Sequence, residues 1–257
     1  MKDISHHFQK SALNLPGWHH GDGKGSNPLV VFYLAEGRSR QTLPEDRDTV
    51  ANETERVRRI YDESADKYDR QISFCENLLF GGGREWVCSQ AHGEVLEVAI
   101  GTGRNLPYHP KGVSLTGVEL SPAMLEVARD RARKLGIEAD LRVGDATALP
   151  FPDESFDTVV MTLALCTIPD DQAAIAEASR VLRSGGRLLL LEHVRSPLLP
   201  VRVVQRILDP LFVRFEGDHL LREPLDYLME HSLRVERLER SKWGIVERLS
   251  ARKPEPA

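Results

Sequence analysis

Residues 94–103 constrain the fold most, because an apolar run there passes directly into a glycine turn. The stretch reads Glu-Val-Leu-Glu-Val-Ala-Ile-Gly-Thr-Gly. An acidic residue, Glu119, ends a second apolar run sixteen positions after Gly103. A strand that ends in glycines before a helix start is typical of sheets that bind ligands at the ends of their strands.

Strands and helices alternate from residue 94 onward, as in parallel α/β sheets with right-handed crossovers. Helix starts are expected after Ser121 and after Asp170, and Gly185-Gly186 is expected to end the second of these helices. The expected strands cover residues 94–100, 114–119, 138–143, 156–163 and 187–193.

The end of the chain follows another pattern. Residues 233–241 and 245–252 are extended segments around Trp243-Gly244, with no room for a helix between them, so they must pair antiparallel. The predicted fold is therefore α/β: a Rossmann-like seven-stranded sheet, mostly parallel with an antiparallel C-terminal hairpin, and helices on both faces.

Three segments are expected outside this core. Residues 1–52 read as a flexible N-terminal arm, with two histidine doublets, a glycine-rich run and one apolar piece at 29–35 that should dock somewhere. Residues 53–91 read as an N-terminal helical cap. Residues 194–232 form an insertion in which apolar residues alternate with arginines, and Asp209-Pro210 is expected to break its helix.

Composition narrows the functional classes. The net charge of −5 and the pI near 6.0 disfavour a nucleic-acid binder. Three cysteines without a CxxC pair predict neither a disulfide framework nor a metal site and fit the cytoplasm. No apolar run approaches the ~20 residues of a membrane-spanning helix, and the N-terminus lacks a signal-peptide pattern.

Four strand ends should meet at one edge of the sheet and form a nucleoside site. The turn Gly101-Thr102-Gly103 permits close backbone approach. Glu119 is placed to accept hydrogen bonds from ribose hydroxyls, and Asp145 could accept one from an adenine amino group. Thr162 follows the fourth strand at the same edge.

These motifs, read together, carry a family resemblance. The segments 96–103, 117–125, 144–157 and 181–187 resemble the successive motifs of class I S-adenosylmethionine (SAM)-dependent methyltransferases. The most similar subgroup contains the ubiquinone/menaquinone C-methyltransferases, over about residues 57–252, and residues 61–69 resemble its helix that closes over the cofactor. The resemblance implies a methyltransferase domain over residues 53–257, with SAM as cofactor and 194–232 on the substrate side.

The resemblance also assigns roles to residues. Glu97 and the Gly101–Gly103 turn would hold the methionine part of SAM, Glu119 the ribose, and Asp145 with Ala146 the adenine. The further cofactor-binding candidates are Tyr68, Leu120 and Thr162. In two places the chain departs from the family pattern: Ala99 stands where a first glycine is usual, and Ser184 replaces a proline.

The reaction places its own demands on the chain. A general base is needed only if the acceptor must lose a proton, and His193, at the end of the fifth strand, is the candidate. The acceptor is expected to be a small molecule. It would be lipophilic if residues 194–232 form an apolar pocket or a patch on a membrane surface. A core-facing helix is the alternative for that segment.

Several alternatives stay open. Residues 163–166, 192–194, 208–210 and 215–218 also resemble a methyltransferase branch that acts on small thiols at lipid membranes. A quinone carbon, a phospholipid amine and a small-molecule oxygen or thiol therefore all remain acceptor classes. The chain could instead bind SAM without catalysis. A nicotinamide-dependent oxidoreductase is disfavoured, because Leu106 occupies the third position of a GxGxxG motif.

Overall fold

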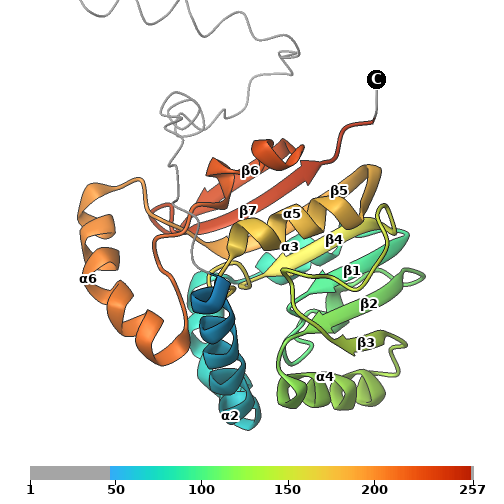
Figure 1. Cartoon of the computed structure of the whole chain (residues 1–257), viewed down its shortest axis with the longest axis horizontal. Helices are drawn as coiled ribbons and strands as arrows, with labels where there is room; N and C mark the ends of the chain where they lie inside the picture. Colours follow the sequence, from blue (N-terminus) through green and yellow to red (C-terminus); the bar gives the residue numbers. More distant parts are fainter. Residues whose placement is uncertain (1–46, 256–257) are drawn as a thin grey trace, which may run out of the picture. The chain divides into compact units, whose positions relative to one another are not determined.

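The computed structural model describes residues 47–255, so the histidine doublets and the apolar piece at 29–35 lie outside the described residues. Short 3₁₀ turns lie at Leu106–Tyr108, Pro224–Asp226 and Met229–His231. The elements, labelled in Figure 1, are α2 (Arg47–Leu79), α3 (Gly83–Cys88), β1 (Glu94–Val98), β2 (Ser114–Glu119), α4 (Pro122–Leu135), β3 (Asp140–Val143), β4 (Phe156–Thr162), α5 (Asp171–Val181), β5 (Leu182–His193), α6 (Leu199–Glu216), β6 (Arg234–Ser241) and β7 (Val246–Arg252).

A seven-stranded sheet in the order β3-β2-β1-β4-β5-β7-β6 forms the centre of the described chain. Strands β1 to β5 pair parallel, whereas β7 pairs antiparallel with both β5 and β6. The predicted fold class, with its antiparallel C-terminal hairpin, is confirmed.

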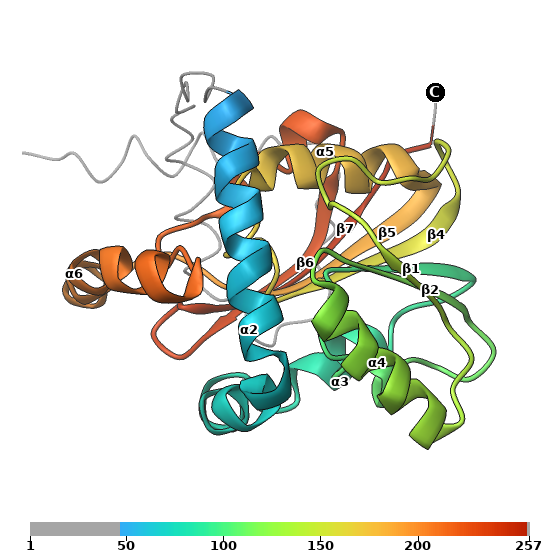
Figure 2. The same cartoon turned by 60° about the horizontal axis from the view of Figure 1, so that its bottom comes forward.

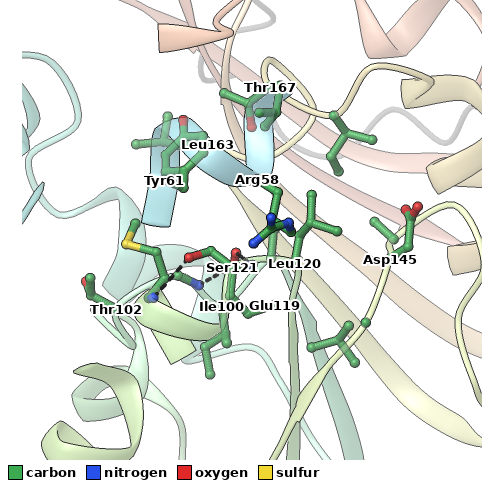
Figure 3. Close-up of a pocket in the computed structure, with 18 of the residues that line it drawn as sticks. Arg58, Tyr61, Ile100, Thr102, Glu119, Leu120, Ser121, Asp145, Leu163 and Thr167 are labelled. Atoms are coloured by element: carbon green, nitrogen blue, oxygen red, sulfur yellow. Dashed lines mark hydrogen bonds between the residues drawn. The ribbon is translucent and has the colours of Figure 1, made fainter. Parts of the chain in front are cut away.

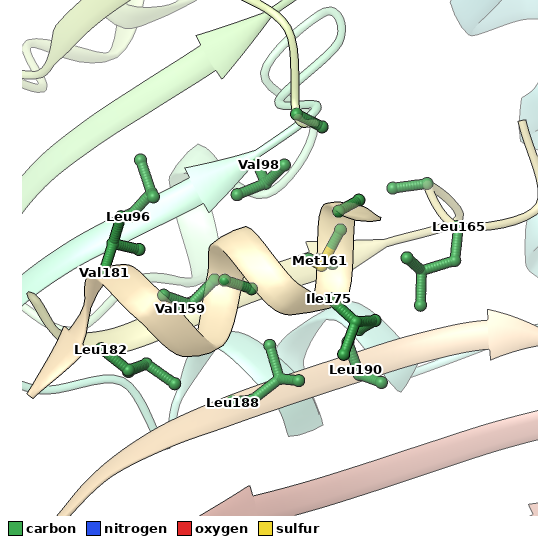
Figure 4. Close-up of a cluster of buried hydrophobic side chains, with 14 of the residues drawn as sticks. Leu96, Val98, Val159, Met161, Leu165, Ile175, Val181, Leu182, Leu188 and Leu190 are labelled. Carbon is green, nitrogen blue, oxygen red and sulfur yellow. The ribbon is translucent and has the colours of Figure 1, made fainter. Parts of the chain in front are cut away.

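Two apolar cores flank the sheet, because side chains along a strand alternate between its faces. Leu188 and Leu190 of β5 pack with α5 on one face, as Figure 4 shows for Leu190 and Ile175, while Leu189 and Leu191 pack with α3 and α4 on the other. All four leucines are fully buried, and each such side chain stabilises the fold by about 1.5–3 kcal/mol. Helices on both faces are thus confirmed.

The predicted helix starts are also confirmed. Ser121 Oγ accepts a hydrogen bond from the Met124 amide at 3.1 Å, and Asp170 Oδ1 accepts one from the Ala173 amide at 2.9 Å. These caps satisfy amides that a first helical turn leaves without partners. They fix where α4 and α5, the helices that follow β2 and β4 in the chain, begin.

The start of β5 differs from its prediction. Helix α5 ends at Val181 and β5 begins at Leu182, so Gly185-Gly186 lies inside the strand and does not end the helix. The pairing with β4 is irregular there, and Gly185 has a φ of 79°. A side chain at Gly186 would meet the Arg183 carbonyl at 2.8 Å. The glycine pair therefore permits a β-bulge at the start of β5.

Helix boundaries differ at two other places. Helix α2 begins at Arg47, so the arm–cap boundary expected after residue 52 falls inside it. The expected break at Asp209-Pro210 is wrong, because α6 continues through Pro210 to Glu216. Tertiary hydrogen bonds hold both halves: Gln205 donates to the Val194 carbonyl, and Arg56 donates to the Val213 carbonyl at 2.8 Å. No helix of the described residues is long and apolar enough to cross a membrane.

Candidate active site

A pocket opens at the carboxyl ends of β1, β2 and β4. Helix α2 contributes one wall, and Figure 3 shows Arg58 and Tyr61 facing the strand ends that carry Glu119 and Asp145. The predicted residues that line it are Tyr68, Gly101, Thr102, Glu119, Leu120, Asp145, Ala146 and Thr162. Three predicted residues, Glu97, Gly103 and His193, are not among the described residues that line this pocket.

Glu119 is held in place by two backbone amides. Its Oε2 accepts from the Gly101 amide and its Oε1 from the Ser121 amide, each at 2.9 Å. Burial raises the pKa of Glu119, and the bonds from Ser121 and Gly101 oppose that rise. A carboxylate fixed in this way keeps further lone pairs for a ligand in the pocket.

The glycine turn combines close packing with strain. Gly101 has a φ of 57°, and a side chain at Gly103 would meet Leu106 at 2.8 Å and Ala128 at 3.2 Å. Position 103 therefore requires glycine because the backbone there packs closely against α4, and Gly103 is not part of the pocket wall. Ala99, which lines the pocket where the family pattern has glycine, has a φ of 55°. A residue with a Cβ costs about 1–2 kcal/mol in this left-handed region.

Glu97 belongs to a buried network beside the pocket. Its Oε1 accepts from Asn105 Nδ2 and its Oε2 bonds His109 Nε2, both at 2.8 Å. Arg84 donates to Asn105 Oδ1 at 2.8 Å and to Thr162 Oγ1 at 3.1 Å, and it reaches the pocket wall. Both oxygens of Glu97 thus have protein partners, and Arg84 is the member of this network that lines the pocket.

Helix α2 is tied to the loops that form the pocket. Asp62 Oδ1 accepts from Ser121 Oγ at 2.6 Å and from the Ala123 amide at 3.2 Å. About two helical turns further on, Asp69 Oδ1 accepts from Thr102 Oγ1 at 2.6 Å. The helix therefore closes the pocket through bonds to both the glycine turn and the start of α4.

His193 lies in a second cluster, beyond the pocket wall. Its Nε2 is 2.8 Å from Asp218 Oδ1, while its Nδ1 is buried with no hydrogen-bond partner among residues 47–255. The Cys166 thiol also bonds Asp218, and the three groups lie within 4.8 Å of one another, close enough to hold a metal ion. Burial lowers the pKa of His193, but the Asp218 carboxylate outweighs it, so the net shift is upward.

Tyr61 connects this cluster with the pocket. Tyr61 lines the pocket and forms a hydrogen bond with the Thr167 side chain. Burial raises the pKa of Tyr61, and the nearby groups Tyr68, Cys166 and Asp218 raise it further. Beneath the cluster, Glu192 accepts from the Ala164 and Leu165 amides.

Sequence reasoning missed Arg58, Arg84 and Asp218. Two of them lie on helices α2 and α3, where arginine is ordinarily a solvated residue, and nothing near them in the sequence marks a ligand site. Asp218 follows α6 and reaches His193 across 25 positions of the chain. The segment 215–218 carried the resemblance to a methyltransferase branch that acts on thiols, but that resemblance assigned no role to Asp218.

Comparison with known proteins identifies the family. Residues 96–190 match a family model described as a methyltransferase domain. The chain is 38% identical over 127 residues to the phosphatidylethanolamine N-methyltransferase of Cereibacter sphaeroides, covering 49% of this chain and 61% of that protein. It is 34% identical over 182 residues to the ubiquinone/menaquinone biosynthesis C-methyltransferase UbiE of Haemophilus ducreyi, covering 65% of this chain and 69% of that protein.

A solved structure agrees. A SAM-dependent methyltransferase from Methanosarcina mazei superposes with a TM-score of 0.54 at 25% identity, covering 65% of this chain and 95% of that one. The chain spans only about three fifths of the length of the first curated relatives that it matches. The shared fold, the matched domain and the glycine turn with Glu119 at the strand ends agree with one another. The chain belongs to the class I SAM-dependent methyltransferases, in the subgroup of the ubiquinone/menaquinone C-methyltransferases.

Proposed function

We propose that the protein transfers a methyl group from SAM to a small lipophilic acceptor that loses a proton in the reaction. The observation that carries the proposal is the pairing of two features at one sheet edge. The first is the pocket built around Glu119 and the glycine turn. The second is the hydrogen-bonded pair of His193 and Asp218 beyond Tyr61.

The residues of the pocket fit the cofactor. SAM supplies an electrophilic methyl group on a sulfonium, so the protein need only align donor and acceptor and exclude water. In this proposal Glu119 binds the ribose hydroxyls, Asp145 and Ala146 bind the adenine, and the backbone of Gly101 and Thr102 lies against the methionine part. Glu97, whose two oxygens bond protein groups, is not assigned to the methionine part here; Arg84, which lies on the pocket wall in a salt bridge with Glu76, would face the methionine carboxylate.

The hydrogen bond between His193 and Asp218 supports a role for His193 as the base. If Nε2–H donates to Asp218, the lone pair lies on Nδ1, and that atom is buried without a protein partner. We propose that Nδ1 accepts the proton of the acceptor and that Asp218 stabilises the resulting imidazolium. Asp218 would act through His193 and would not itself take the proton.

The acceptor class follows from two supports. The names of the two curated relatives refer to phosphatidylethanolamine and to ubiquinone or menaquinone, both lipids. The segment 194–232, which we propose as the acceptor side, carries exposed apolar residues on α6. An O–H or S–H on a lipophilic molecule suits this base, and so does a protonated amine, whose pKa is close to that of a phenol; a thioether has no proton to give up.

The test is methyl transfer from radiolabelled SAM into a cell extract that is then separated into organic and aqueous phases. Label should enter the organic phase. His193→Gln and Asp218→Asn should slow transfer by about 10²–10⁴-fold without weakening SAM binding by calorimetry. The exposed His92 offers a matched control, His92→Gln. A protein that binds SAM and labels neither phase would support the non-catalytic alternative, and unaltered rates in both variants would remove the base.

A further inference from the structure

Helix α6 exposes one continuous apolar face. Five of its residues repeat every four positions, the spacing that aligns side chains along one side of a helix, and other apolar residues widen the stripe. Their exposed fractions are Leu199 68%, Val203 48%, Val204 54%, Ile207 71%, Leu208 39%, Leu211 54% and Phe215 64%. Folded proteins rarely leave so many neighbouring large apolar side chains in water without a partner.

The opposite side of α6 fixes this face outward. Gln205 is buried; its Nε2 donates to the Val194 and Leu220 carbonyls and its Oε1 accepts from the Ser196 amide at 2.8 Å. Figures 1 and 2 show α6 standing at the side of the sheet, away from α3, α4 and α5. The helix therefore cannot rotate to bury its stripe without breaking these bonds.

The charges beside the stripe are mainly positive. Arg206 and Arg214 are exposed, and Arg214 lies 6.0 Å from the centre of the Phe215 ring. Asp209 is turned inward and accepts from the Leu220 amide, which leaves Glu216 as the exposed acid of the helix. Because the whole chain carries a net charge of −5, this basic and apolar helix stands out from its surroundings.

An exposed tryptophan lies next to the start of α6. The Trp243 side chain is 69% exposed, and its carbonyl accepts from Ser196 Oγ at 2.7 Å. Tryptophan favours the boundary between water and lipid, where its ring is apolar and its N–H can bond.

We propose that the outer face of α6 docks on the surface of an anionic lipid bilayer. The helix would lie in the plane of the interface, with its apolar stripe among the acyl chains and Arg206 and Arg214 at the phosphates. A second copy of the chain fits the face less well. Arg206 lies near the middle of α6, so in a symmetric pair of copies it would approach its own counterpart, whereas the phosphates of an anionic bilayer would pair with it.

Helix α6 ends close to the proposed base. Its C-cap is Gly217, and the next residue, Asp218, bonds His193. This part of the argument rests on the proposed function: a lipophilic acceptor would enter from the bilayer next to its base. The docking itself needs only the exposed stripe and the arginines.

The experiment is flotation of the full chain with phosphatidylcholine vesicles, with and without phosphatidylglycerol. The unmodified protein should float with the anionic vesicles, and salt should weaken its binding. Ile207→Glu combined with Leu211→Glu should lower partitioning by at least about 100-fold, because two large apolar side chains leave the lipid. Phe74→Glu is the matched control, since Phe74 is 75% exposed on α2, and it should float like the unmodified chain.

Two further measurements separate the outcomes. Calorimetry with SAM should give equal affinity in all three proteins. Failure of the unmodified protein to bind SAM would count against the proposed function and not against docking. Light scattering reports self-association: a dimer that Ile207→Glu with Leu211→Glu dissociates would overturn the proposal. A folded monomer that ignores both kinds of vesicle would also overturn it.

Discussion

Replacing Glu119 by glutamine tests the cofactor site most directly. The side chain keeps its shape but loses its charge, and its new amide group faces the backbone N–H of Gly101 or of Ser121. Alanine is the poorer probe, because it leaves two amides without their partner and costs about 1–3 kcal/mol for each in stability.

The magnitude follows from the bonds that change. A hydrogen bond to a charged group contributes about 1.5–3 kcal/mol and one between neutral groups about 0.5–1.5 kcal/mol. With one or two ribose hydroxyls bound to the carboxylate, Glu119→Gln should weaken SAM binding by roughly 1–3 kcal/mol, or about 5- to 150-fold in Kd.

The assay is calorimetric titration with SAM and with a 2′-deoxy analogue. The analogue should bind the unmodified protein more weakly than SAM does, and Glu119→Gln should bind the two ligands almost equally. Glu97→Gln is the matched control, because Glu97 is buried nearby with both oxygens bonded to protein groups. Unchanged SAM affinity in Glu119→Gln, with the fold intact, would refute the ribose assignment.

Three other perturbations test separate parts of the structure. Ala99→Gly should raise the free energy of unfolding by up to about 1 kcal/mol in thermal melts, because relief of the left-handed backbone exceeds the entropy that glycine adds to the unfolded chain; a lower stability would contradict the strain. Burial raises the pKa of Glu192 from 4.5 to about 7, so the folded chain loses stability as the pH rises through that interval. Glu192→Gln should therefore gain up to about 3 kcal/mol at pH 8 and nothing at pH 4 in denaturant titrations, and an equal gain at both pH values would disprove this. Dialysis against a chelator should leave methyl transfer unchanged, because hydrogen bonds already connect Cys166 and His193 to Asp218. Loss of activity that Zn²⁺ restores would show that the three residues are metal ligands.

The pocket shows what local sequence can and cannot predict. Gly101, Glu119 and Asp145 lie at or just beyond the ends of strands. Parallel strands bring their carboxyl ends to one edge, so the alternation of strands and helices predicted that these residues meet. Arg84 and Asp218 reach the site from a short helix and from the loop after α6. Their positions depend on how those elements pack, and no periodicity in the sequence encodes that.

The sequence by itself determined the α/β class, the antiparallel end of the sheet, the caps of α4 and α5 and the glycine turn, because these depend on hydrophobic period and backbone chemistry within a few residues. Only the tertiary structure decided the course of α6. Proline at position 210 removes one local hydrogen bond, but bonds from Gln205 and Arg56 to distant carbonyls keep the helix whole. It likewise decided that Glu97 is engaged within the protein and that the stripe of α6 faces outward, since both depend on neighbours far away in the chain.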